Sequence, residues 1–293
     1  MRIEAEHHEM VVSDGRRLAW QRWPSVGSTV RGYVVALHGI QSHSGWYEAS
    51  SRRLAEAGFE VCFLDRRGSG RNPDSRGDAL HADRLVHDVT QFLAEAGHRR
   101  DQENPNSPVV LQAVSWGGKL ATIVASRRPD LVDALALLYP GLRARVGPSW
   151  WARFRLGLAR RLEIRDKLVE IPLQDPALFT RNRDWQRFIR NDPLTLRDVT
   201  VGFLLANQDL DRELDEAVCR VVCPSLLMLA GGDRILDNAA VVELFERFAS
   251  EKRRQLEYPT AEHTLEFEDC RDEFIADLLG WLDELCGGVA AGH

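Results

Sequence analysis

The sequence of 293 residues has no apolar run that approaches the 18 residues of a membrane-crossing helix. Its N-terminus, MRIEAEHHEM, is charged and lacks the apolar segment of a signal peptide, so we expect a cytoplasmic protein without a transmembrane segment. The five cysteines are odd in number and widely spread, which favours reduced thiols over a disulfide framework. A net charge of −6 gives no reason to expect nucleic-acid binding.

Cysteine and histidine residues at the spacing of a metal site are also scarce. Cys219 and Cys223 are four residues apart, but no histidine or second cysteine pair lies near them. We therefore expect buried thiols there and no metal site.

Apolar runs of strand length alternate with segments of helical spacing. The predicted strands are 10–12, 17–23, 33–37, 60–64, 109–114, 135–138, 225–230 and 254–258, and the predicted helices include 46–57, 82–96, 241–248 and 274–285. The first two strands read as a hairpin, because Ser13-Asp14-Gly15 joins them. The alternation predicts an α/β fold with a mostly parallel sheet and helices on both faces.

The alternation stops between residues 141 and 200, where helical stretches rich in Arg and Trp show no clear buried strand. We therefore divide the chain into a first core part (1–140), a helical cap insertion (141–200), a second core part (201–286) and a disordered tail (287–293). The insertion has thirteen Arg and Lys against seven Asp and Glu, a net charge of +6. A solvated helical face would explain this charge, and so would contact with an anionic substrate or an anionic membrane surface.

The segment Pro108–Lys119, PVVLQAVSWGGK, predicts a strand, a sharp turn and a helix with Ser115 at the turn. The pattern is G-x-S-x-G with Ala113 in the first position. At such a turn the serine hydroxyl is exposed, and the next backbone N–H points into the same space. A helix N-cap is the other interpretation of this serine.

A nucleophilic serine needs a base and an acid. His263 lies in a short loop after the last predicted strand, at the carboxyl edge of the sheet where α/β sites form, although a surface histidine is an alternative. Asp233 lies just past strand 225–230, whereas Asp237 precedes a helix and suits an N-cap. We therefore predict a triad of Ser115, Asp233 and His263.

Acyl transfer also needs donors for the developing oxyanion. We predict the backbone N–H groups of Trp116, which begins the helix after Ser115, and of Ile40, which follows His38-Gly39.

Five segments in register resemble the α/β-hydrolases of the monoacylglycerol lipase and bacterial lysophospholipase group (serine-aminopeptidase-like, S33-type). They are LHGIQSHSGWYE, FLDRRGSGRN, VSWGGKLA, LLMLAGGDRILDN and AEHTLEF, and NDPL at Asn191–Leu194 resembles the cap-exit segment of that group. The resemblance implies an α/β-hydrolase fold with an eight-stranded sheet and a helical cap over an acyl pocket. It also implies serine-ester hydrolase chemistry on a small acyl ester, of monoacylglycerol or lysophospholipid type, without a cofactor.

The turn departs from this group at three residues. Ala113 replaces the usual glycine, Val114 replaces a histidine, and Trp116 stands where a methionine is common. We therefore expect the substrate specificity to differ from that of the group, because a bulky indole beside the nucleophile would narrow the pocket.

Two other functions remain open on the same residues. An acyltransferase or an amide or peptide hydrolase would use the same triad, since the sequence does not identify the acyl acceptor. A non-catalytic binding protein of this fold is the other alternative, which the complete set of triad residues disfavours.

Overall fold

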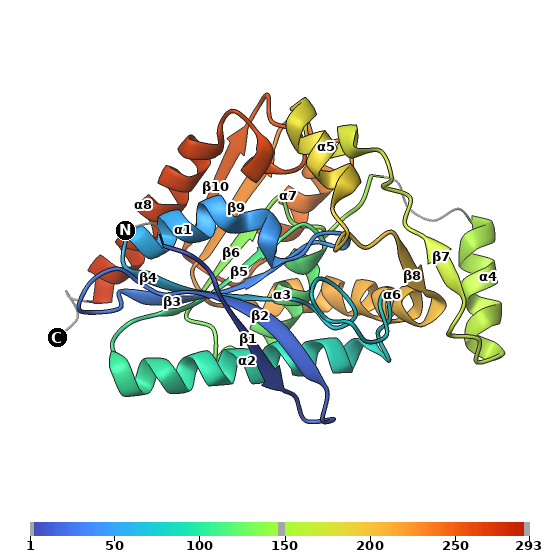
Figure 1. Cartoon of the computed structure of the whole chain (residues 1–293), viewed down its shortest axis with the longest axis horizontal. Coiled ribbons are helices and arrows are strands. Elements are labelled where there is room, and N and C mark those ends of the chain that lie inside the picture. The colour runs from blue at the N-terminus through green and yellow to red at the C-terminus, as the bar shows by residue number, and fades with distance from the viewer. Residues whose placement is uncertain (1–2, 146–149, 290–293) are drawn as a thin grey trace.

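The computed structural model describes residues 3–145 and 150–289, and its centre is an eight-stranded sheet (Figure 1). The strand order is β1-β2-β4-β3-β5-β6-β9-β10. The strands are β1 (Glu6–Val11), β2 (Arg17–Trp23), β3 (Gly32–Leu37), β4 (Phe59–Leu64), β5 (Val109–Val114), β6 (Ala134–Leu138), β9 (Ser225–Ala230) and β10 (Arg253–Tyr258). β2 pairs antiparallel with β1 and β4, and every other pairing in this sheet is parallel. The predicted mostly parallel eight-stranded fold is confirmed.

Helices cover both faces of the sheet (Figure 1). The core helices are α1 (Glu48–Glu56), α2 (Ala82–Glu103), α3 (Trp116–Arg127), α6 (Val201–Ala217), α7 (Asn238–Glu246) and α8 (Arg271–Val289). Side chains of α1 and α8 share one apolar cluster on one face, and those of α2, α3, α6 and α7 share a second cluster on the other. Strands β3, β4, β5, β6 and β9 are buried along their whole length, as expected between two helical layers.

Several helices and strands are longer than predicted. β1 begins at Glu6 instead of residue 10, and α2 continues to Glu103, seven residues beyond its predicted end at residue 96. The polar residues there suit a helix end at the surface as well as they suit a loop. α8 extends to Val289, so the expected disordered tail does not begin at 287, and residues 290–293 lie outside the described part.

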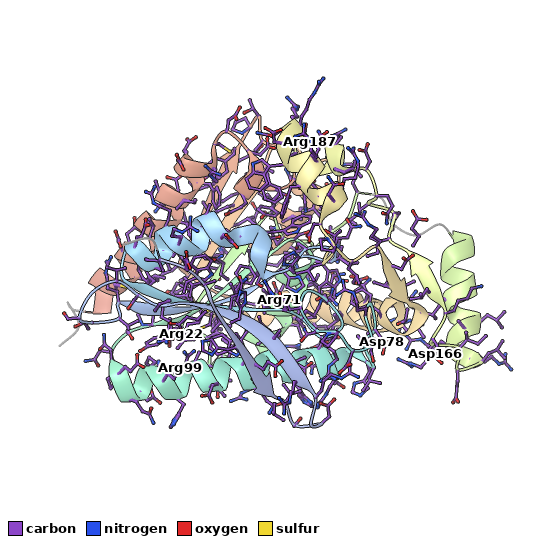
Figure 2. All side chains as sticks on the ribbon, in the orientation of Figure 1. Arg22, Arg71, Asp78, Arg99, Asp166 and Arg187 are labelled. Carbon is purple, nitrogen blue, oxygen red and sulfur yellow. The ribbon has the colours of Figure 1, made fainter. Side chains whose placement is uncertain are left out.

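The segment between β6 and β9 contains α4 (Trp150–Arg161) and α5 (Arg183–Asn191) and also two short strands. β7 (Leu168–Glu170) and β8 (Asp198–Thr200) pair antiparallel, so the insertion contains a short strand pair in addition to the helical stretches that the sequence indicates. All three residues of β7 are exposed, so the strand has no buried face. Its sequence therefore shows no apolar pattern that would predict a strand. Figure 2 shows Asp166 and Arg187 of this segment at the outer surface.

Candidate active site

Ser115 stands between β5 and α3 in a strained backbone conformation, with φ 49° and ψ −129°. A positive φ is costly for a residue with a side chain and persists only where the surroundings enforce it. The two glycines that follow are required by close packing. A Cβ on Gly117 would lie 2.7 Å from the carbonyl oxygen of His38, and one on Gly118 would lie 2.4 Å from Pro140 Cβ. This is the sharp strand-to-helix turn that the sequence predicted.

The three residues of the predicted triad lie together. His263 Nε2 is 2.8 Å from Ser115 Oγ, and His263 Nδ1 is 2.7 Å from Asp233 Oδ2. The Asp233 carboxylate can only accept at neutral pH, so Nδ1 carries the proton and Nε2 faces the serine as an acceptor. His263 and Asp233 are both buried.

Asp233 is held as a carboxylate by its neighbours. Its second oxygen, Oδ1, accepts backbone hydrogen bonds from Ile235 at 2.7 Å and Leu236 at 3.0 Å. Burial by itself would raise the pKa of Asp233, but the facing His263 and these two N–H groups lower it below its ordinary value. Asp237 instead accepts from Ala240 N–H as the N-cap of α7.

Two aromatic rings flank His263. Tyr139, at the end of β6, and Phe179, from the segment between β6 and β9, meet it edge-on with ring centroids at 5.1 and 5.8 Å. The backbone N–H of Thr264 also donates to the carbonyl of Phe179 at 2.9 Å. The inserted segment therefore contributes one wall of the site.

The loop after β3 lies directly against Ser115. A Cβ on Gly39 would be 3.1 Å from Ser115 Cβ. His38 Nδ1 donates to the carbonyl of Gly39 at 2.7 Å, and Gly39 N–H donates to Ser42 Oγ at 3.0 Å. These bonds fix the loop that carries Ile40.

Trp116 begins α3, and its N–H has no acceptor within the helix. Its indole is only 7% exposed and packs against Phe203 of α6, with ring centroids 5.2 Å apart. Indole Nε1 donates to Asn207 Oδ1 at 2.8 Å. The bulk of Trp116 is thus held in the core between α3 and α6, which argues against the expected narrowing of a pocket at Ser115. Ala113 and Val114 are buried in β5.

A second buried histidine–carboxylate pair joins the loop after β3 to the segment NDPL. His43 Nε2 donates to Asp192 Oδ2 at 2.9 Å, and Trp46 Nε1 donates to the same oxygen at 2.8 Å. Leu196 N–H donates to the carbonyl of Gln41 at 2.9 Å. Sequence reasoning missed this pair, and its only signal was a histidine in a glycine-rich loop.

Within the described residues, no group of three or more His, Cys, Asp or Glu side chains is arranged to hold a metal ion. No helix in the same part of the chain is long and apolar enough to cross a membrane.

The sequence profile of the family described as serine aminopeptidase, S33, matches residues 28–270. The chain belongs to this family. Mouse monoglyceride lipase is 24% identical to this S33-type hydrolase over 288 residues, which cover 97% of this chain and 92% of the mouse protein. The monoacylglycerol lipase of Mycolicibacterium smegmatis is 25% identical over 94% of this chain and 96% of its own.

Solved structures agree with this S33-type fold. The monoacylglycerol lipase of Paleococcus ferrophilus superimposes with a TM-score of 0.79 at 25% identity, over 92% of this chain and 99% of that one. A soluble variant of the Saccharomyces cerevisiae monoglyceride lipase reaches 0.84 over 97% and 96% of the two chains, and at 17% identity it supports the fold alone.

Proposed function

We propose that the chain is a serine hydrolase that cleaves small acyl esters, of monoacylglycerol or lysophospholipid type, through Ser115, His263 and Asp233. The chain is a carboxylic ester hydrolase, and the substrate class follows its relatives, which include lysophospholipase L2 of Escherichia coli at 27% identity. The observation that carries the proposal is the contact of 2.8 Å between His263 Nε2 and the hydroxyl of the strained Ser115.

In the proposed mechanism, His263 Nε2 takes the proton of Ser115 as Oγ attacks the acyl carbon. Asp233 stabilises the imidazolium that forms and keeps the ring in the orientation the transfer needs. The N–H groups of Ile40 and Trp116 receive the negative charge of the tetrahedral intermediate. His263 then gives its proton to the leaving alcohol, and water attacks the acyl-enzyme by the same route in reverse to release the acid.

A fluorophosphonate probe tests the nucleophile. We expect wild-type protein to be labelled at Ser115 and to hydrolyse a panel of esters, and Ser115→Ala to lose both activities. Ser126→Ala is the matched control, because Ser126 is a buried serine of α3, the helix that follows Ser115, and within the described residues its hydroxyl bonds only to the Ile123 carbonyl. Labelling that persists in Ser115→Ala would reject the assignment.

The acyl acceptor and the scissile bond need separate measurements. Products are analysed with and without a competing alcohol or amine, and a panel of aminoacyl amides is run beside the esters. Esters hydrolysed to free acid, with amides untouched, support the proposal. Acyl transfer to the added alcohol, or preference for amides, would instead support an acyltransferase or a peptidase on the same triad.

The proposed cap is the insertion 141–200, and the described part of its surface suits contact with lipid. Its exposed apolar side chains are Leu158, Leu162, Ile164, Leu168 and Val169, and Arg160, Arg161, Arg165 and Lys167 lie among them in the sequence. Apolar side chains interleaved with cations favour an anionic lipid surface. We therefore extend the proposal to peripheral contact with lipid through this cap, and we retain the cytoplasm as the predicted location.

A further inference from the structure

Arg66 is a buried cation without an acidic partner. It follows β4 and is only 5% exposed, yet no ion pair among the described residues includes it. Its neighbour Asp65 instead accepts the backbone N–H groups of Ser44 and Arg71, each at 2.8 Å. A buried charge that is not paired is expensive, so the fold keeps Arg66 at a cost in stability.

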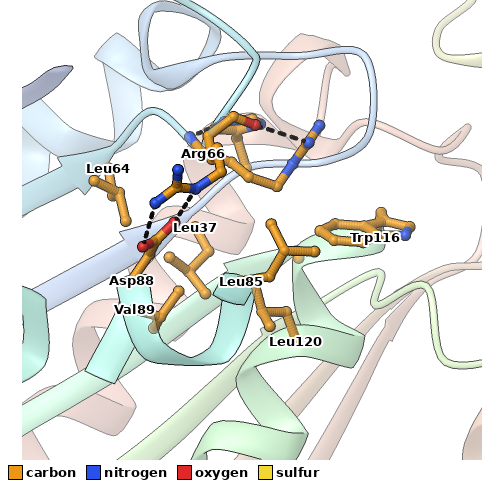
Figure 3. Close-up of a pocket in the computed structure, with 11 residues that line it drawn as sticks. Leu37, Leu64, Arg66, Leu85, Asp88, Val89, Trp116 and Leu120 are labelled. Carbon is orange, nitrogen blue, oxygen red and sulfur yellow. Dashed lines mark hydrogen bonds and ion pairs between the residues drawn. The ribbon is translucent and has the colours of Figure 1, made fainter. Parts of the chain in front are cut away.

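Arg67 shows what a purely structural arginine looks like in the same loop. It is equally buried, but it donates to Asp88 at 2.7 Å and to Asp14 at 2.9 Å. Both Arg67 and Asp88 line a small cavity, and Figure 3 labels Asp88 beside it. The cavity holds only about 10 Å³, which is close to the least volume that admits one water and far too small for an acyl chain. Arg66 therefore does not face a substrate pocket there.

The guanidinium of Arg66 instead contacts both residues of the proposed oxyanion hole. It donates to the carbonyl of Ile40 at 3.0 Å and lies 4.9 Å from the ring centroid of Trp116, with Phe203 at 4.8 Å. Its Nε has no hydrogen-bond partner among the described residues. Nη1 donates to the carbonyl of Arg67 at 3.3 Å. The side chain is thus held by two rings and two carbonyls, one of which belongs to the loop that approaches Ser115.

The main chain of Arg66 acts on the same loop through His38. Arg66 N–H donates to His38 Nε2 at 2.8 Å, so His38 carries its proton on Nδ1 and donates it to the carbonyl of Gly39. The Gly39 carbonyl and the Ile40 N–H belong to the same peptide group. A hydrogen bond accepted by a peptide carbonyl polarises its N–H and strengthens it as a donor.

The protonation states agree with these roles. Burial and the charge of Arg66 hold the pKa of His38 well below its ordinary value, so the imidazole is neutral at neutral pH. Burial lowers the pKa of Arg66 to about 9, against the opposing charge of Asp65, and the guanidinium is still cationic at pH 7.

From this arrangement we propose that Arg66 is a positioning residue for the oxyanion hole. Its side chain holds the Gly39–Ile40 loop in place. Its fixed positive charge stabilises the oxyanion, a negative charge that develops only in the transition state. The inference rests on the proposed serine-hydrolase function and deepens it. Charge stabilisation that is realised only in the transition state lowers the barrier without tightening substrate binding.

The test compares Arg66→Met with Arg66→Lys. One oxyanion donor is worth about a hundredfold to a thousandfold in kcat, and Arg66 acts through Ile40 and Trp116 rather than by direct contact. We therefore expect Arg66→Met to lower kcat by about tenfold to a hundredfold with KM changed by less than about twofold. Arg66→Lys, which keeps the charge, should recover most of this loss.

A transition-state analogue separates this role from simple packing. An alkyl trifluoromethyl ketone is attacked by the serine and becomes a bound oxyanion, so its inhibition constant should rise in Arg66→Met by the same factor as kcat falls. Arg67→Met is the matched control, because Arg67 is a buried cation of the same loop whose side chain pairs with Asp88 and Asp14 instead of the oxyanion loop. It should lose stability and keep both kcat and the inhibition constant.

Rates are normalised to the fraction of molecules that a fluorophosphonate labels, and Arg66→Gln replaces Arg66→Met if the latter does not fold. An uncharged variant with wild-type kcat and inhibition constant would overturn the inference while leaving the proposed function intact. Failure of Arg66→Lys to exceed Arg66→Met would overturn it as well. If the wild-type protein neither labels at Ser115 nor cleaves esters, the proposed function and the inference both fall.

Discussion

The buried carboxylate of Asp192 is the clearest place to perturb the contact between the proposed cap and the loop after β3. Oδ2 accepts hydrogen bonds from His43, Trp46 and Thr195 at 2.8–2.9 Å, and Oδ1 accepts one from Leu194 N–H at 3.0 Å. Its side chain is only 6% exposed, so water cannot replace a lost partner. Asp192→Asn keeps the shape but offers one acceptor oxygen and an NH2 group.

The magnitude follows from these four bonds. If the amide oxygen faces the three side-chain donors, each of those bonds loses its charge assistance, and Leu194 N–H faces another donor. Taking about 1 kcal/mol for each of the three weakened bonds and about 1–3 kcal/mol for the unsatisfied N–H gives a loss of about 4–6 kcal/mol. With an unfolding entropy of about 0.6 kcal/mol/K for a domain of this size, that corresponds to a fall in Tm of roughly 6–10 °C.

The pH dependence has a definite sign. Burial alone would raise the pKa of Asp192, but the bonds from His43 and Trp46 outweigh it and hold the pKa well below its ordinary value. A carboxyl group with a lowered folded-state pKa stabilises the protein above its unfolded pKa of about 4, and this stabilisation is lost as the pH falls through the folded pKa. The difference between wild type and Asp192→Asn should therefore be constant near neutral pH and shrink below about pH 4.

The assay is a thermal melt by circular dichroism across this pH range, with Asp175→Asn as control. Asp175 is an exposed N-cap in the same segment, and Asn replaces Asp at such positions with little change in stability. A Tm change in Asp192→Asn no larger than in the control would refute the reasoning.

Two further predictions concern the triad and the cap. Asp233→Asn removes the acceptor that orients His263, and kcat on an ester, normalised to the folded fraction, should fall by about 10³- to 10⁴-fold at pH 7; a loss below tenfold in steady-state assays would contradict that role. Arg161→Glu removes one exposed positive charge of the cap and adds a negative one. At about 1 kcal/mol for each unit of charge near such a surface, this should weaken binding to vesicles of mixed neutral and anionic lipid by about thirtyfold at low salt. Arg53→Glu on α1 makes the same change in net charge elsewhere, and equal loss for both variants in a sedimentation assay would argue against cap docking.

The sheet and the candidate triad were predictable because each depends on a local signal. Tyr33–Leu37 and Leu226–Ala230 are uninterrupted apolar runs, and burial on both faces of a parallel strand favours such runs. Asp233 and His263 follow strands directly, so sheet topology alone brings them to one edge.

The remaining features depend on partners that are distant in sequence. Asp192 and His43 are 149 residues apart, and neither has a neighbour in sequence that predicts the pair. The direction of the Trp116 indole is set by Asn207 of α6, a helix that sequence reasoning did not place. β7 is paired but exposed, and an exposed strand shows no alternation of apolar residues.

The pairing of β6 with β9 has a consequence for how this chain can change. Leu135 is in register with Ser225, so the chain leaves the sheet after β6 and returns to the adjacent position. The intervening segment can lengthen, shorten or be exchanged without altering the spacing of Ser115, Asp233 and His263, because none of them lies within it. A replacement segment must still place two side chains correctly. It needs an aromatic ring at the position of Phe179, which contacts His263, and a carboxylate at the position of Asp192, which accepts a hydrogen bond from His43. A library of transplanted caps built on this scaffold should therefore hold those two residues constant and vary the rest of residues 141–200. It should keep α6, which also lies between the two strands and packs against Trp116.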